Sequence, residues 1–121
     1  MTDRIRIEGL RLRTIIGIND EERHDRQDVV LNLTLYVDTR KAGRTDDIAD
    51  SPVNYRTLTK QVITYVDGNR FNLVESLAES VASICLEFPG VSRVEVAADK
   101  PGALRFADSV GVTIERVRSN G

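Results

Sequence analysis

The chain has 121 residues, of which 40% are hydrophobic and 30% are charged, with a formal net charge of −2. We therefore expect one globular domain over residues 1–121, and the slight acidity argues against nucleic acid as a partner. No apolar run approaches the roughly 20 residues of a membrane span, so we expect no membrane partner. The single cysteine, Cys85, excludes an internal disulfide and fits a cytoplasmic location. Together with the single histidine, His24, it is too little for the usual zinc site, so we expect no metal.

The first half of the chain predicts two strands. Residues 4–16 alternate in polarity, but their apolar positions change from odd to even numbers at Glu8 and Gly9, which predicts a β-bulge. Residues 28–38 alternate without interruption and predict a strand with one apolar face. The polar residues 39–54 that follow predict a loop, without a strand or a long helix.

The second half predicts two helices and then two more strands. Residues 55–67 and 73–88 carry apolar side chains at helical spacing, with Tyr65 on the predicted buried side of the first helix. Residues 94–98 and 110–114 alternate in polarity as strands do. The order of elements is therefore β-β-α-α-β-β.

This order predicts an α+β fold, in which two helices cover one face of a four-stranded antiparallel sheet. Such a sheet has two open edges, and open edges pair readily with another chain. We therefore expect an oligomer.

Glu75 has two interpretations. It lies three residues after Asn72 at the start of the second predicted helix, which is the spacing of a capping box. That structural role is the more frequent one for a glutamate at this position. The functional alternative is a carboxylate that faces a pocket, where its two oxygens accept paired N–H donors of a heterocycle.

Lys100 and two other polar residues also have a structural and a functional interpretation. Lys100 precedes Pro101 and Gly102 between two strands, so it is either a charge in a hairpin loop or an acid–base group. Glu22 lies in a loop rich in charged residues, which favours plain solvation. Tyr55, at the start of the first helix, would usually pack its ring and hydrogen-bond its hydroxyl. The spacing of these residues alone does not predict an enzyme.

Four segments carry a specific signal when they are taken together: "LRLRTIIGINDEE", "AGRTDDIADSPVNYRTLTK", "RFNLVESLAE" and "DKPGALRFADSVGVTIER". In this order they closely resemble the dihydroneopterin aldolase family, over residues 4–117. The resemblance implies a tunnelling fold, in which β-β-α-α-β-β subunits join their sheets into a ring. Two tetrameric rings would stack as a homo-octamer.

The resemblance also implies a small-molecule pterin substrate that binds between subunits. It places Glu75, which follows Leu73 and Val74, on the amino-pyrimidinone edge of the pterin. Backbone groups near Val53 and Val74 would complete that contact.

The resemblance implies catalysis without a cofactor, because the C6=N5 imine of a dihydropterin can itself accept the electrons released when the C1′–C2′ bond breaks. Lys100 would be the general acid–base group, acting at N5. Tyr55 would move the proton at C1′, and Glu22 would orient the side-chain end of the substrate.

Within the family, "LRLRTIIGI", "NYRTLTK" and "ALRFADSV" are more similar to the epimerases than to the aldolases. They imply epimerisation at C2′ of 7,8-dihydroneopterin triphosphate. The alternatives are cleavage of dihydroneopterin to 6-hydroxymethyl-7,8-dihydropterin and glycolaldehyde in folate biosynthesis, and a pterin-binding oligomer without catalysis. A triphosphate requires cations, for which Arg13, Arg26, Arg70 and Arg105 are candidates. We favour Arg105 because it lies close to Lys100 in the sequence.

Overall fold

The computed structural model describes residues 3–20 and 24–118. Its long elements follow the predicted order β-β-α-α-β-β, with three short elements added. The elements are β1 (Asp3–Ile16), β2 (Gln27–Val37), α1 (Arg40–Thr45), a 3₁₀ helix (Ile48–Asp50), α2 (Tyr55–Asp67), β3 (Arg70–Phe71), α3 (Val74–Leu86), β4 (Arg93–Pro101) and β5 (Ser109–Val117).

The sheet has five strands in the order β3-β1-β2-β4-β5, so the prediction of four strands was wrong by one. The extra strand, β3, has two residues and pairs in parallel with the end of β1, whereas the other neighbours are antiparallel. A two-residue strand is too short to show any periodicity. The predicted bulge is confirmed, because the register of β1 against β2 shifts between Ile7 and Leu10, where Gly9 has a φ of +67°.

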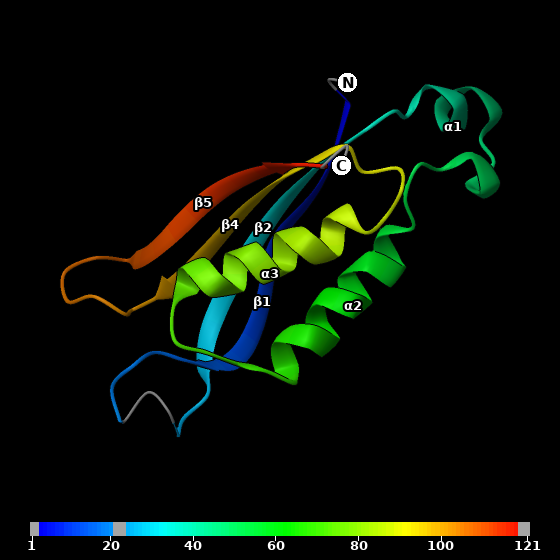
Figure 1. Ribbon diagram of the computed structural model, residues 1–121. Coiled ribbons are helices and arrows are strands. Elements are labelled where there is room, and N and C mark those ends of the chain that lie inside the picture. The colour runs from blue at the N-terminus through cyan, green and yellow to red at the C-terminus, as the bar shows by residue number, and fades with distance from the viewer. Residues whose placement is uncertain (1–2, 21–23, 119–121) are drawn as a thin grey trace.

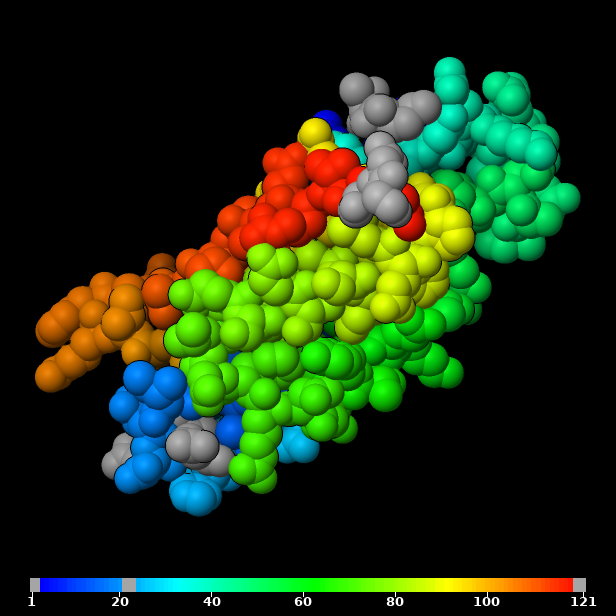
Figure 2. Space-filling view, in the orientation of Figure 1, coloured from blue at the N-terminus to red at the C-terminus, as the bar shows by residue number. Residues whose placement is uncertain are grey.

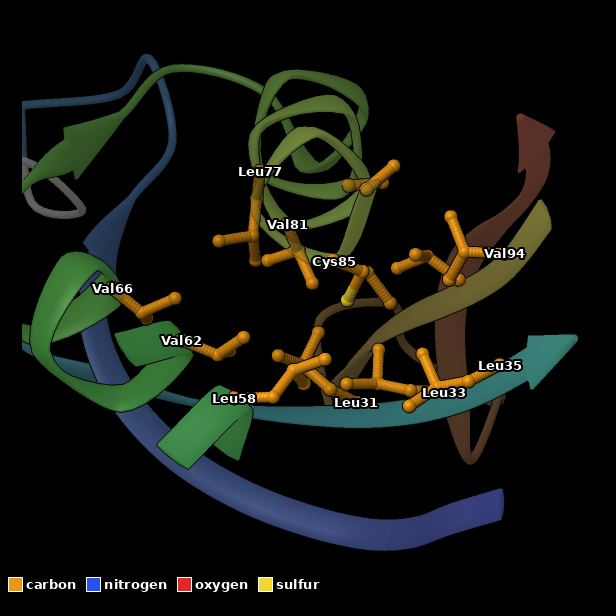
Figure 3. Close-up of a cluster of buried hydrophobic side chains, with 14 of the residues drawn as sticks. Leu31, Leu33, Leu35, Leu58, Val62, Val66, Leu77, Val81, Cys85 and Val94 are labelled. Carbon is orange, nitrogen blue, oxygen red and sulfur yellow. The ribbon is translucent and has the colours of Figure 1, made fainter. Parts of the chain in front are cut away.

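Both long helices lie on one face of the sheet, as predicted (Figure 1). Between them and the sheet lies a single core, in which apolar side chains of β2 and β4 meet those of α2 and α3 (Figure 3). Cys85 is buried in this core, and burial raises the pKa of its thiol to about 12. The opposite face of the sheet carries mostly polar side chains, which are exposed on β1 and β5 and partly buried on β2 and β4.

The predicted helix boundaries need small corrections. Helix α2 matches residues 55–67, but Tyr65 is partly exposed and its ring lies 6.2 Å from that of Phe71. Helix α3 begins at Val74, and its last residue is Leu86. The segment 39–54, predicted as a loop, contains the six-residue helix α1, which buries no residue.

The hairpin between β4 and β5 projects beyond the body of the molecule (Figure 2). It lies at one end of the sheet, near the start of α3, whereas the start of α2 lies at the other end, near α1 (Figure 1). Within residues 3–20 and 24–118, no helix is long and apolar enough to cross a membrane.

Candidate functional site

A pocket of about 320 Å³ lies where the start of α3 meets the ends of β1, β4 and β5. Three segments line it: residues 16–18, residues 72–75, and Lys100 with residues 110–112. Three of the exposed large apolar side chains of the chain are at this pocket, namely Ile18, Leu73 and Val110. Exposed apolar side chains gathered around a polar group are typical of a binding site.

Lys100 is the buried cation of this pocket. It pairs with Val110 inside the β4–β5 ladder, so the interpretation as a charge in a hairpin loop was wrong. Its side chain follows the buried positions Val94, Val96 and Ala98 on the core face of β4, and only 8% of the residue is exposed. A lysine is rarely buried to this extent unless its charge is paired.

Glu75 lies in the same pocket, in the first turn of α3. The capping-box interpretation was wrong, because the N-cap residue is Leu73 rather than Asn72, and no side chain caps this helix. Glu75 is exposed, and its carboxylate makes no hydrogen bond or ion pair with the rest of the described chain. Its carboxylate and the first N–H groups of α3 are therefore available to a ligand.

Gly111 is a pocket residue that sequence reasoning missed. A Cβ atom at this position would lie 2.1 Å from Asp99 Oδ1 and 2.3 Å from the carbonyl oxygen of Ala98. Only glycine therefore permits this close pairing of β5 with β4 beside Lys100. The signal was present in the sequence, since an isolated glycine inside an alternating strand indicates a close approach of another backbone.

Tyr55 and Val53 are not part of this pocket. Tyr55 is the first residue of α2, and Asn54 caps that helix by accepting hydrogen bonds from the N–H groups of Arg56 and Thr57, at 3.2 Å each. Tyr55 is 52% exposed and lies in a separate open depression of about 490 Å³ along α2, while Val53 is buried. Within one chain, the predicted site residues are thus divided between the two ends of the sheet.

Two further residues predicted from the sequence are Arg105 and Glu22. Arg105 lies in the exposed β4–β5 hairpin, with its guanidinium carbon 5.4 Å from the centre of the Phe106 ring, and it does not line the pocket. Glu22 lies outside the described residues, so its predicted role remains a prediction. His24, predicted at the surface, is exposed.

A larger cavity than the pocket at Lys100, of about 520 Å³, is a groove between α2 and α3. Its charged residues, Lys60 and Glu87, are both exposed. Because no buried polar group points to chemistry there, the smaller pocket at Lys100 is the better candidate. In the described part of the chain, no three His, Cys, Asp or Glu side chains are grouped so that they could hold a metal ion.

A family model, sequence relatives and a solved structure all point to the same protein family. The family model described as dihydroneopterin aldolase matches residues 5–115. The dihydroneopterin triphosphate 2′-epimerase of Escherichia coli is 49% identical over 110 residues, which cover 91% of each chain. The dihydroneopterin aldolase of the same organism is 40% identical over 114 residues, covering 94% of this chain and 93% of the aldolase. The crystal structure of E. coli dihydroneopterin aldolase in complex with neopterin superposes with a TM-score of 0.90 at 39% identity, covering 95% of this chain and 99% of that one.

Proposed function

Because this chain belongs to the dihydroneopterin aldolase family, we propose that it epimerises 7,8-dihydroneopterin triphosphate at C2′ to dihydromonapterin triphosphate. The observation that carries the proposal is the convergence of buried Lys100 and exposed Glu75 on one pocket. The choice of an epimerase is supported by the higher identity to the E. coli epimerase than to the aldolase of that organism.

Substrate binding would begin at the start of α3. The carboxylate of Glu75 can accept two hydrogen bonds from the amino-pyrimidinone edge of the pterin. Leu73 and Val74 belong to the uncapped first turn, so their backbone groups can contact the same edge. This arrangement would direct the C6 side chain of the pterin toward Lys100, which lines the same pocket.

The chemistry would be a reversible retro-aldol reaction. Loss of the 2′-hydroxyl proton forms the aldehyde at C2′ and breaks the C1′–C2′ bond, and that electron pair moves through C6 onto N5, where a proton is taken up. Lys100 would supply and recover the proton at N5 as a general acid–base group. The released two-carbon aldehyde, which carries the phosphates, turns in the pocket. C1′ then attacks the other face of its carbonyl carbon, C2′. This re-addition gives the epimer.

Tyr55 and Glu22 would act on the C6 side chain of the substrate. Protonation of C1′ by Tyr55 would prevent re-addition and would yield the aldolase product, while Glu22 would orient the hydroxyl groups of the side chain. The balance between isomerase and lyase would therefore depend on how quickly C1′ is protonated relative to re-addition.

Since Tyr55 and Val53 lie far from Lys100 in one chain, we propose that a second copy brings them to the pocket. Two features support this. β1 pairs with β3 only at Ile15 and Ile16, so most of its length is an open edge, and no strand in the described part of the chain covers the outer edge of β5. Both ends of the molecule also expose apolar side chains: Ile18, Leu73 and Val110 at the pocket, and Tyr55 and Ile63 along α2.

The charges on the two edges support a head-to-tail pairing. The exposed face of β1 carries four arginines, which are Arg4, Arg6, Arg11 and Arg13. On the same face, β4 and β5 carry three carboxylates, Glu95, Asp99 and Glu115, and one arginine, Arg93, which forms an ion pair with Glu115. Pairing of β5 with β1 of the next copy would bring this face, where carboxylates outnumber cations, beside the arginines of β1. Repetition of this contact would close a ring. The proposed assembly is a homo-octamer of two stacked tetrameric rings, with sites between subunits.

The alternative function is that of a lyase, which would release 6-hydroxymethyl-7,8-dihydropterin and glycolaldehyde. It is supported by 40% identity to E. coli dihydroneopterin aldolase over almost the whole chain. The same pocket would serve both reactions.

A product assay tests the proposal. Purified protein is incubated, without added metal, with 7,8-dihydroneopterin and separately with its 3′-triphosphate, and the pterins are resolved by chromatography that separates the epimers. Fast conversion of the triphosphate to its epimer supports an epimerase. Dominant release of the 6-hydroxymethyl product from the unphosphorylated substrate supports the lyase, and binding without turnover of either substrate would leave a pterin-binding protein.

A further inference from the structure

The β4–β5 hairpin contains a turn that is unusual for its sequence. The hairpin is closed by the N–H of Gly102 bonding to the Asp108 carbonyl, at 3.0 Å, and by the N–H of Ala107 pointing to the Leu104 carbonyl, at 3.4 Å. In the turn from Leu104 to Ala107, the third residue, Phe106, has a φ of +70°. A positive φ at this position alone is the pattern of a type II turn, where glycine is the usual residue.

Folding does not explain a phenylalanine at this position. The residue is 100% exposed, so its ring contributes no buried area. A bulky side chain is also strained in this backbone region. The same hairpin uses a glycine, Gly102, at its other position of positive φ, which is also +70°. An exposed, strained aromatic residue therefore points to a function outside the folded monomer.

The one ring contact of Phe106 in the described part of the chain is with its neighbour Arg105. The guanidinium carbon lies 5.4 Å from the ring centre, within the range of a cation–π interaction. Arg105 makes no ion pair or hydrogen bond within residues 3–20 and 24–118. The Phe106 ring thus holds the planar guanidinium of Arg105, while the five N–H donors of the guanidinium are available to an oxyanion.

We propose that Phe106 is a positioning residue, which holds Arg105 where the phosphates of the substrate leave the pocket and so sets the preference for triphosphate over unphosphorylated dihydroneopterin. This inference rests on the proposed function. The hairpin continues directly from Lys100 on β4, so a phosphate chain beyond the reacting carbons would extend toward it. An aromatic ring under a guanidinium leaves the edge of that group free for two parallel hydrogen bonds to a phosphate.

The test compares Phe106→Asn with Phe106→Tyr. Asparagine tolerates a positive φ but cannot stack on Arg105, whereas tyrosine keeps the ring. The quantity measured is kcat/KM for the triphosphate divided by kcat/KM for the unphosphorylated substrate. We expect this ratio to fall roughly five- to tenfold in Phe106→Asn, through a higher KM for the triphosphate, and to be restored in Phe106→Tyr.

Thermal unfolding separates positioning from damage to the fold. Because the strained ring is removed, Phe106→Asn should raise the melting temperature by about 2–5 °C even as the preference is lost. Leu104→Ala is the matched control, since it removes an exposed apolar side chain from the same turn without disturbing the stack. An equal fall of the ratio in Leu104→Ala would overturn the proposal.

Other outcomes are equally decisive. An unchanged ratio in Phe106→Asn, or a change of oligomeric state on gel filtration that accounts for the loss, overturns the role of Phe106 and leaves the proposed function intact. If the unaltered protein turns over neither pterin, the proposed function fails, and the role of the hairpin fails with it.

Discussion

Helices α2 and α3 are both 13 residues long and lie on the same face of the sheet, yet they begin differently. At α2, the side chain of Asn54 accepts hydrogen bonds from two backbone N–H groups. At α3, Leu73 has the extended conformation of an N-cap residue but offers no acceptor. A capping side chain is worth about 1 kcal/mol. The chain thus lacks that stabilisation where the helix meets the pocket, and the first N–H groups of α3 stay open to a ligand.

Loss of the buried lysine in the pocket at the uncapped end of α3 should have the strongest effect on activity. Lys100→Met keeps most of the buried stem and removes the ammonium group, so kcat should fall by roughly 10²- to 10⁴-fold with the fold retained. Lys41→Met, which alters an exposed lysine on α1, is the matched control and should keep full activity. Steady-state kinetics and circular dichroism check both variants. Comparable activity in Lys100→Met and Lys41→Met would remove Lys100 from the mechanism.

A paired experiment separates the two helix starts. Glu75→Gln loses the charged acceptor, so kcat/KM should fall about 10- to 100-fold while the free energy of unfolding changes by less than about 0.5 kcal/mol. Asn54→Ala should instead lower the free energy of unfolding by about 1 kcal/mol. Urea denaturation and pterin turnover are measured on both variants. If Glu75→Gln proved to be the destabilised one, Glu75 would have a structural role after all.

Capping α3 should exchange function for stability. Leu73→Asn supplies the missing acceptor at a residue whose φ of −129° and ψ of 145° suit an N-cap. We expect a gain of about 0.5–1 kcal/mol in the free energy of unfolding and a higher KM for the pterin, because the new side chain occupies N–H groups that the ligand needs. Leu73→Ala controls for loss of the leucine itself. A stabilised variant with unchanged KM would show that those N–H groups do not contact the substrate.

The smallest effect concerns the other end of α3, where Cys85 is buried (Figure 3). Burial raises the pKa of its thiol from 9.0 to about 12, so the native thiol should resist alkylation at pH 9 while the urea-unfolded chain reacts quickly. The unfolded state loses this proton first, so the contribution of Cys85 to stability falls as the pH rises from 9 toward 12. Fast alkylation of the native protein would contradict the burial.

The sequence predicted the periodic parts of this molecule well. The apolar alternation of residues 28–38 and the helical spacing of residues 55–67 correspond closely to β2 and α2, because long segments that bury one face repeat a clear pattern. β3 was missed because two residues have no period. The α3 cap was misassigned because Asn72 and Glu75 match a capping box by spacing, although the helix starts one residue too late to use it.

Of the candidate site residues, the sequence could not show which ones share a pocket. Glu75 and Lys100 line the same pocket, but Lys100 was ambiguous from the sequence, since a polar residue beside Pro101 and Gly102 matches a loop as well as the end of a strand. The distance between Tyr55 and the pocket could not be read from the sequence, because it depends on the directions in which α2 and α3 cross the sheet (Figure 1).

If a shared site exists, the pocket at the uncapped end of α3 is completed by the capped end of α2 from another copy. Mixing of two variants tests it directly: Lys100→Met removes one half of the site, and Tyr55→Ala removes the other. The reaction followed is release of 6-hydroxymethyl-7,8-dihydropterin, which needs both Lys100 and Tyr55. Each variant alone should release almost none of this product, while co-expression in equal amounts should restore about one site in four, since random assembly places two intact halves together that often. A mixture that releases no more product than its separate components, or full release by Tyr55→Ala alone, would contradict a site shared between copies.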